Sequence, residues 1–179
     1  MRKDQGVSLI EVLLTSFILT VVLLAVAMSM GAGIYSMFFT QEQLIAKQKA
    51  REALESVFTA RSTQNVTWDE IRNASADGIF VDGFLEIREM GDDGIANTAD
   101  DAEDVLETLR FPGPDGDLGT EDDEARPLFN FQRRITISNV MVDEDTVDAD
   151  IRLITVDVRF QIRGVWHTIT VNSYISRFA

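Results

Sequence analysis

The sequence predicts an α+β fold in which one long N-terminal helix is followed by an antiparallel β-sheet. Three observations predict it: an uncharged apolar run over residues 12–39, a helical spacing of apolar residues over 41–61, and alternating apolar and polar residues toward the C-terminus. A chain of 179 residues is long enough to build one domain with a hydrophobic core. We therefore expect a helix and a sheet that pack against each other.

The apolar run is the first element. Residues 12–39 contain no charged side chain, and as a helix they would extend about 40 Å, enough to cross a bilayer. An ordinary secretory signal has a shorter apolar core. Arg2 and Lys3 favour a cytoplasmic N-terminus, although basic residues at 47–51 weaken this argument. We predict a transmembrane helix over residues 7–40 that crosses the membrane once.

The helix is expected to continue beyond the membrane, over residues 41–64. Residues 41–61 contain neither Pro nor Gly, and their apolar residues recur at steps of three and four. The predicted apolar stripe comprises Ala46, Ala50, Ala53, Leu54, Val57 and Phe58. Gly31 and Gly33 weaken the helix by up to about 1 kcal/mol each. One helix from about residue 7 to residue 61 would be about 80 Å long.

The remaining residues, 65–179, have the pattern of an antiparallel β head. The strand candidates are residues 84–88, 105–111, 131–140, 151–162 and 165–175. Arg163 and Gly164 separate the last two candidates, which therefore form a predicted hairpin. We expect one face of the sheet to pack on the helix stripe and the other to face solvent.

Composition excludes several classes of function. The net charge of −14 disfavours nucleic-acid binding, which needs a basic surface. The chain has no cysteine and one histidine, His167, so a disulfide framework, a thiolate metal site and a histidine-based triad are not expected. No nucleophile–base pair, phosphate loop or zinc spacing is evident. The sequence therefore does not predict an enzyme.

Two acidic loops, residues 91–104 and 113–125, share an internal repeat. Residues 91–101 and 113–123 both fit the frame G-x-D-G-x-x-x-T-x-D-D. Neither loop contains a basic residue. Two copies are too few for a solenoid, so the repeat is interpreted as a duplicated loop.

The duplicated loops are candidate calcium sites. Crowded carboxylates repel one another unless a cation lies among them, and calcium takes six to eight oxygens, often from Asp side chains near a Gly turn. The candidate ligands are Asp93, Asp100, Asp101, Asp115, Asp117, Asp122 and Asp123, with Thr98 and Thr120 placed to orient them. The EF-hand frame is absent. The alternative is a pair of solvated acidic loops without a metal.

The N-terminal segment carries the most specific motif. Gly6-Val7-Ser8-Leu9-Ile10-Glu11 follows a basic leader and precedes the apolar run. This segment resembles the type IV prepilin signature, although Phe is commoner than Val at position 7. The resemblance implies that a prepilin peptidase removes residues 1–6 by cleaving after Gly6, and that the new N-terminus at Val7 is methylated. It also implies that Glu11 pairs with the Val7 amine of a neighbouring subunit. The alternative is a signal-anchor helix with an incidental Glu11.

The resemblance also suggests a class of subunit. Major type IVa pilins usually carry a disulfide, whereas the pseudopilins of type II secretion resemble this chain better and include a calcium-binding major subunit. Residues 155–160 and 165–171 look like the final strand pair of minor pilins and pseudopilins. The subunit that caps the pseudopilus tip typically lacks the glutamate, so Glu11 disfavours that role.

The expected protein is a minor pilin or pseudopilin of a type IV pilus or a type II secretion pseudopilus. Its expected partners are the prepilin peptidase, other pilin or pseudopilin subunits and the bacterial inner membrane, with the head in the periplasm or outside the cell. The alternative is a single-pass, membrane-anchored calcium-binding module that does not assemble into filaments. Residues alone do not decide between secretion, motility and DNA-uptake systems.

Overall fold

One long helix and one four-stranded sheet dominate the structure, a computed structural model that describes residues 8–101, 105–143 and 146–178. Helix α1 spans Leu9–Ser62 and is followed by the short 3-10 helix η1, Ala74–Ala76. The strands are β1 (Leu85–Glu86), β2 (Thr108–Phe111), β3 (Glu124–Pro127), β4 (Phe131–Asp143), β5 (Thr146–Ile162) and β6 (Val165–Ser176). These elements confirm the predicted α+β class.

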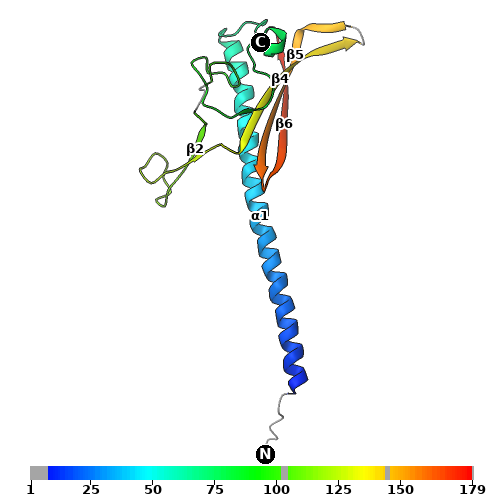
Figure 1. Ribbon diagram of the computed structural model, residues 1–179. Helices are drawn as coiled ribbons and strands as arrows, with labels where there is room; N and C mark the ends of the chain where they lie inside the picture. Colours follow the sequence, from blue (N-terminus) through cyan, green and yellow to red (C-terminus); the bar gives the residue numbers. More distant parts are fainter. Residues whose placement is uncertain (1–7, 102–104, 144–145, 179) are drawn as a thin grey trace, which may run out of the picture. The chain divides into compact units, whose positions relative to one another are not determined.

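The main sheet has the order β1-β4-β5-β6 and is antiparallel throughout (Figure 1). The pairing of β5 with β6 continues without interruption from Ile162 and Val165 to Ile151 and Ser176. Arg163 and Gly164 make the two-residue turn with φ angles of 50° and 82°, the left-handed values that a type I′ hairpin turn requires. The predicted terminal hairpin is therefore confirmed.

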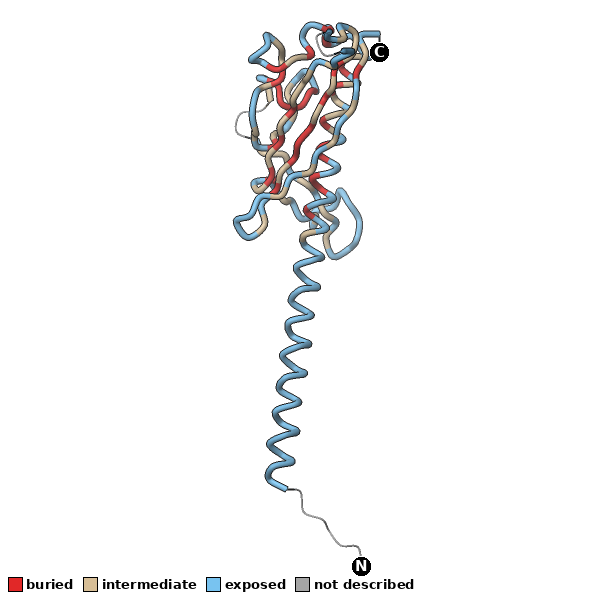
Figure 2. The backbone as a smooth tube through the Cα atoms, turned by 90° about the vertical axis from the view of Figure 1, so that its right-hand side faces the viewer, coloured by how far each residue is buried: buried red, intermediate tan, exposed pale blue. Residues whose placement is uncertain are grey.

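The chain divides into two compact units, Met1–Gln41 and Glu42–Ala179. In the first unit, every described residue from Ser8 to Phe38 is exposed (Figure 2). In the second unit, α1 packs its buried stripe on one face of the sheet. That stripe contains four of the six predicted residues, and its members are Glu42, Ile45, Ala46, Lys49, Ala50, Ala53, Val57 and Ala60. Leu54 and Phe58 lie at its margin and are half-buried.

The inner face of the sheet completes the core. Ile135 of β4 and Ile154, Val156, Val158 and Phe160 of β5 are fully buried. The buried apolar residues of α1 that complete this core are mostly alanines: Ala46, Ala50, Ala53 and Ala60. Trp68 and Ile71, from the segment after α1, close one end of this core.

The sequence pattern predicted two strands that are longer than the observed β1 and β2, and it did not predict β3. The candidate at 84–88 forms only the two-residue β1, and the candidate at 105–111 forms a strand only from Thr108. Strand β3 lies partly inside the segment that was predicted to be an acidic loop, and it pairs with β2 as a separate hairpin. That hairpin is fixed to α1 by ion pairs from Glu107 to Lys49 and from Arg126 to Glu42.

Candidate functional site

The N-terminal end of α1 holds Glu11, the one charged side chain of the described part of the first unit. The Ser8 carbonyl accepts hydrogen bonds from the backbone N–H groups of Glu11 and Val12, at 2.9 and 3.2 Å, which begins the helix. Glu11 therefore lies in the first turn, where a negative charge is favoured by the helix dipole. Gly6 and Val7, the predicted processing site, lie outside the described residues.

The surface around Glu11 is suited to an apolar environment. Hydroxyl groups in this part of the helix are satisfied locally: Thr15 donates to the Glu11 carbonyl at 2.8 Å, and Thr20 donates to the Ser16 carbonyl at 2.8 Å. The other side chains from Leu9 to Phe38 are apolar, small or aromatic, and all are exposed. By length and composition, α1 is able to cross a membrane. An exposed carboxylate at the edge of such a helix is costly in lipid unless it has a cationic partner.

The two acidic loops fold in the same way. In the first loop, Asp100 accepts hydrogen bonds from the Asp93 backbone N–H at 3.1 Å and from the Thr98 hydroxyl at 2.6 Å. In the second, Asp122 accepts them from the Asp115 N–H at 3.4 Å and from the Thr120 hydroxyl at 2.7 Å. The structure therefore brings Asp93 close to Asp100 and Asp115 close to Asp122 in the two copies of the repeat.

The last Asp of each frame plays an equivalent part. Asp101 accepts a hydrogen bond from the Asn97 N–H at 2.8 Å, and Asp123 accepts one from the Gly119 N–H at 2.7 Å. The other carboxylate oxygen of both residues, Oδ1, is buried and accepts no hydrogen bond within the described part of the chain. Asp117 differs, because its exposed carboxylate makes no such contact among the described residues.

The hydroxyl contacts and burial shift the titration of these groups in opposite directions. The Thr98 hydroxyl lowers the pKa of Asp100, and the Thr120 hydroxyl lowers that of Asp122. Burial raises the pKa values of Asp93 and Asp101 above their ordinary range. The first loop therefore contains carboxylates with clearly different affinities for a proton.

The loops differ in their surroundings. Residues 95–98 of the first loop are buried in the head, whereas every residue from 115 to 122 in the second loop is exposed. Beneath the first loop lies Arg133, whose side chain is fully buried and donates a hydrogen bond from Nε to Asn97 Oδ1 at 2.6 Å. Both Nη atoms of Arg133 are buried and lack hydrogen-bond partners among the described residues. Burial lowers the pKa of Arg133, while the charge of Asp101 favours its cationic form.

Sequence reasoning missed Arg133, although a signal was present. The alternation in residues 131–135 places position 133 on the same face as Phe131 and Ile135, so a charged residue there had to be inward-facing. The structure thus supplies the first loop with an internal cation that the repeat did not reveal.

The carboxylates do not form a ready-made metal centre. Across residues 8–101, 105–143 and 146–178, no group of three or more Asp, Glu, His or Cys side chains is arranged to hold a metal ion. The oxygens of Asp93, Asp100 and their counterparts are instead occupied by backbone N–H groups and hydroxyls. Among the described carboxylates of the two loops, the Oδ1 atoms of Asp101 and Asp123 are buried and accept no hydrogen bond.

Comparison with known proteins identifies the N-terminal segment. Residues 1–27 match the family described as the prokaryotic N-terminal methylation motif. Comparisons with curated proteins and with solved structures find no match. The motif contains Gly6, Val7 and Glu11 and extends to residue 27, so it includes much of the exposed apolar part of α1. The chain therefore carries a type IV pilin-like prepilin signature at the start of a helix that is able to anchor it in a membrane.

Proposed function

We propose that this chain is a structural subunit, a minor pilin or pseudopilin, of a type IV pilus or a type II secretion pseudopilus. The methylation motif supports a subunit of the pilin family, and it implies processing by prepilin peptidase and assembly with other pilins. The observation that carries the proposal is the overlap of this motif, residues 1–27, with an apolar helix surface that is exposed from Ser8 to Phe38. Such a surface needs lipid before assembly and neighbouring helices afterwards.

Glu11 has a specific part in this proposal. Cleavage after Gly6 would create a cationic amine at Val7, four residues before Glu11. In a bundle of staggered helices, the Glu11 carboxylate of one subunit would pair with the Val7 amine of its neighbour. Attraction between these charges is much stronger in an apolar bundle than in water, so the pair would set the register of assembly. Unpaired, Glu11 would oppose burial in the bundle.

Processing and assembly are tested separately in cells that make the filament machinery. N-terminal sequencing of the mature protein should begin at Val7, and Gly6→Val should leave the full-length chain, because Gly6 offers no side chain to obstruct the peptidase. Glu11→Ala should remain inserted and cleaved but be recovered from sheared filaments at much lower yield. A normally shortened Gly6→Val chain would contradict the processing site. Wild-type recovery of Glu11→Ala would contradict its role in assembly, and the absence of the protein from filaments would favour the non-assembling membrane anchor.

We further propose that calcium binds the acidic loops. The Oδ1 atom of Asp123 supports this, because it is a buried anionic oxygen that accepts no hydrogen bond from the described residues, and Oδ1 of Asp101 is its counterpart in the first loop. Asp93, Asp100, Asp115, Asp117 and Asp122 would have to turn toward the ion to complete six to eight oxygen ligands. The second loop is the better candidate, since Arg133 already offsets the charge of Asp101 in the first.

A further inference from the structure

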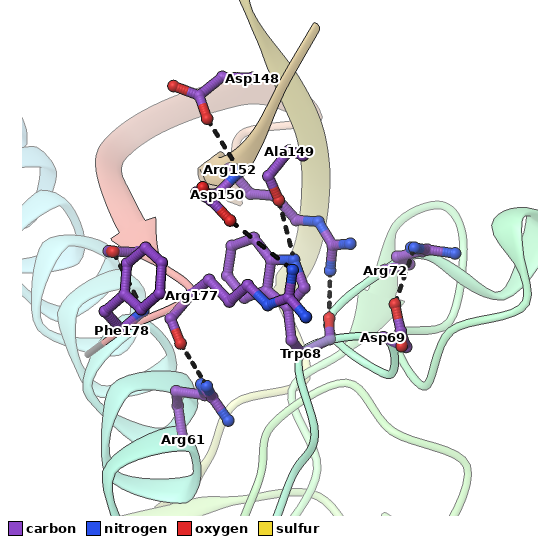
Figure 3. Close-up of polar contacts among 11 residues, drawn as sticks. Arg61, Trp68, Asp69, Arg72, Asp148, Ala149, Asp150, Arg152, Arg177 and Phe178 are labelled. Atoms are coloured by element: carbon purple, nitrogen blue, oxygen red, sulfur yellow. Dashed lines mark hydrogen bonds and ion pairs between the residues drawn. The ribbon is translucent and has the colours of Figure 1, made fainter.

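A cationic cavity opens at the end of the head opposite the acidic hairpin. It has a volume of about 370 Å³ and is lined by Arg72, Ala76, Ile137, Asn139 and Arg152. An adjoining cavity of about 310 Å³ shares Arg72, Asn139 and Arg152 and adds Trp68 and Arg177 to its wall. Figure 3 shows Arg152 and Arg177 beside Trp68, and Arg72 farther away, paired with Asp69. Together the two cavities are lined by three arginines and two aspartates, in a chain with a net charge of −14.

Arg152 is the central residue of this cavity. It is 5% exposed, and its guanidinium lies 4.2 Å from the centre of the Trp68 ring. Its Nη1 donates to the backbone carbonyls of Trp68 and Ile71, as Figure 3 shows for Trp68. No carboxylate in the described part of the chain forms an ion pair with Arg152. Its hydrogen-bond acceptors are neutral carbonyls, and the charge of Asp69 acts on it without forming an ion pair, so the guanidinium retains capacity for an anionic partner.

Arg72 adds a second guanidinium to the same cavity. Its side chain is 41% exposed and contacts Asp69 at 3.1 Å, and Asp69 itself is 84% exposed. The acids Asp69 and Asp148 line only the adjoining cavity, where Asp148 also accepts the Asp150 N–H at 2.8 Å. The larger cavity is lined by two arginines, an amide and two apolar side chains, with no acid among its described lining residues. It therefore suits a ligand that carries carboxylates next to an apolar group.

The second acidic loop of the same chain has this chemistry. Within residues 113–123 it exposes Asp115, Asp117 and Glu121, and Leu118 is 64% exposed beside them. The first loop, in contrast, has Ile95 and Ala96 buried at the positions equivalent to Asp117 and Leu118. The second loop is therefore an acidic surface with one exposed leucine, presented on the β2–β3 hairpin (Figure 1).

The loop and the cavity are held at different ends of the same stretch of helix. The hairpin is fixed to α1 at Glu42 by Arg126. The cavity end is fixed to α1 at Arg61, which donates to the carbonyl of Arg177 at 2.5 Å (Figure 3). Glu42 and Arg61 are 19 residues apart, which is about 28 Å along a helix. One copy is therefore unable to fill its own cavity with its own loop.

We propose that the Arg72–Arg152 cavity receives the second acidic loop, residues 113–123, of another copy of this chain. Carboxylates of the loop would pair with Arg72 and Arg152, and Leu118 would contact Ile137 and Ala76. Two different surfaces on each copy make a heterologous contact, which repeats from copy to copy and generates a helical assembly. The inference rests on the proposed function, because it describes how neighbouring heads contact each other within a filament.

Cysteine cross-linking tests this contact, because the chain contains no cysteine of its own. Two full-length variants, Ala76→Cys in the cavity and Glu121→Cys in the loop, are produced together in cells that make filaments. Oxidation with diamide, which takes up two electrons and two protons per disulfide, should link the two chains. A matched pair with Thr168→Cys, on the outer sheet face, in place of Ala76→Cys should not cross-link. Arg72→Glu in the Ala76→Cys chain should lower the yield of cross-linked product at least about tenfold, because its carboxylate repels the acidic loop. Asp117→Lys in the Glu121→Cys chain should restore that yield.

The outcomes separate the contact from the proposed function. Equal yields for the cavity and control pairs, or an unchanged yield with Arg72→Glu, would overturn the contact. If the chain is nevertheless cleaved after Gly6 and recovered in filaments, the proposed function stands and only the contact between loop and cavity is overturned. Failure of both cleavage and filament recovery would overturn the proposed function and the contact together. Restoration by Asp117→Lys excludes the explanation that Arg72→Glu merely unfolds the head.

Discussion

Two amide side chains make hydrogen bonds to the backbone of β4. Asn73, 9% exposed, donates from Nδ2 to the Ile135 carbonyl and accepts the Ile137 N–H through Oδ1, both at 2.8 Å. It therefore replaces a neighbouring strand at this part of β4. Asn97 adds a hydrogen bond from Nδ2 to the Arg133 carbonyl at 3.2 Å. Buried backbone groups at this edge depend on two amide side chains.

Asn73→Ala should therefore be strongly destabilising. It removes both hydrogen bonds and leaves buried groups of Ile135 and Ile137 without partners, which costs about 1–3 kcal/mol. Urea unfolding of the full chain in detergent, followed by tryptophan fluorescence, measures this, because Trp68 and Trp166 are the chain's two tryptophans and both lie in the head. Asn172→Ala, on the exposed face of β6, is the matched control and should change stability little. Equal effects of the two substitutions would refute the proposed bridging role.

The buried carboxylate of Asp101 should give the head a measurable pH dependence. Burial raises its pKa, so the folded state binds a proton more tightly than the unfolded state does. Ionised Asp101 therefore lowers the free energy of unfolding near neutral pH. This loss disappears as the pH falls through the raised pKa of the folded state toward the pKa of about 3.9 in the unfolded state. The stability of wild type relative to Asp101→Asn should rise between pH 7 and about pH 4, as measured by urea unfolding. A constant difference would show that Arg133 already balances the charge.

At the scale of elements, the duplicated loop offers a comparison within one molecule. The two copies make the same internal hydrogen bonds but differ at all five variable positions of the frame, including Ile95 and Ala96 against Asp117 and Leu118. The apolar pair is buried in the head, and the pair with an acid is exposed. The shared residues of the frame therefore determine the hydrogen bonds within each loop. The variable residues determine whether the loop packs against the rest of the head.

The frame threonines should reveal this difference in stability. Thr98 is 6% exposed, and its hydroxyl donates to Asp100 at 2.6 Å and to the Ile95 carbonyl at 3.2 Å. Thr120 makes the equivalent bonds in solvent. Thr98→Val should lower the unfolding free energy by about 1–2 kcal/mol, and Thr120→Val by less than about 0.5 kcal/mol. Similar losses at the two sites would mean that the first loop contributes no more to the head than the second.

The same elements show what the sequence could and could not predict. Strands β5 and β6 alternate regularly and are joined by Arg163-Gly164, so periodicity and turn chemistry together were sufficient. Strand β3 has no such pattern, because Glu124–Pro127 follows a run of acids and is held by pairing with β2 and by the Arg126–Glu42 ion pair. Those contacts join residues far apart in the sequence. Arg152 and Trp68 are also brought together only by tertiary packing, so the arginine cavity had no local signal.

At the scale of the whole molecule, charge is distributed unevenly. The described part of the first unit is uncharged from Val12 onward, whereas the head carries both the acidic loops and the arginine cavity. An uncharged helix suits lipid or a helix bundle, and a charged head suits water. Assembly would therefore combine apolar contacts between helices with charge-dependent contacts between heads.

Calcium should stabilise the head of this molecule. With chelator, the carboxylates of the two loops repel one another, and no cysteine is present to cross-link the ends of the loops. An ion that binds only the folded state adds RT ln(1 + [L]/Kd), about 2.7 kcal/mol at a hundredfold excess over Kd. We expect a higher midpoint of thermal unfolding in millimolar calcium than in chelator, with tryptophan fluorescence of the full chain as the readout.

Two substitutions locate the effect, and magnesium tests its selectivity. Asp115→Ala combined with Asp122→Ala should shrink the calcium-dependent shift more than Asp93→Ala combined with Asp100→Ala, because Arg133 offsets the charge only beneath the first loop. Magnesium should substitute poorly, since it demands tighter octahedral coordination than these loops offer. The ion would fix the second loop, the same segment that is proposed to enter the arginine cavity of a neighbour. An unchanged melting temperature, together with no heat of binding by calorimetry, would leave both loops as solvated acidic segments.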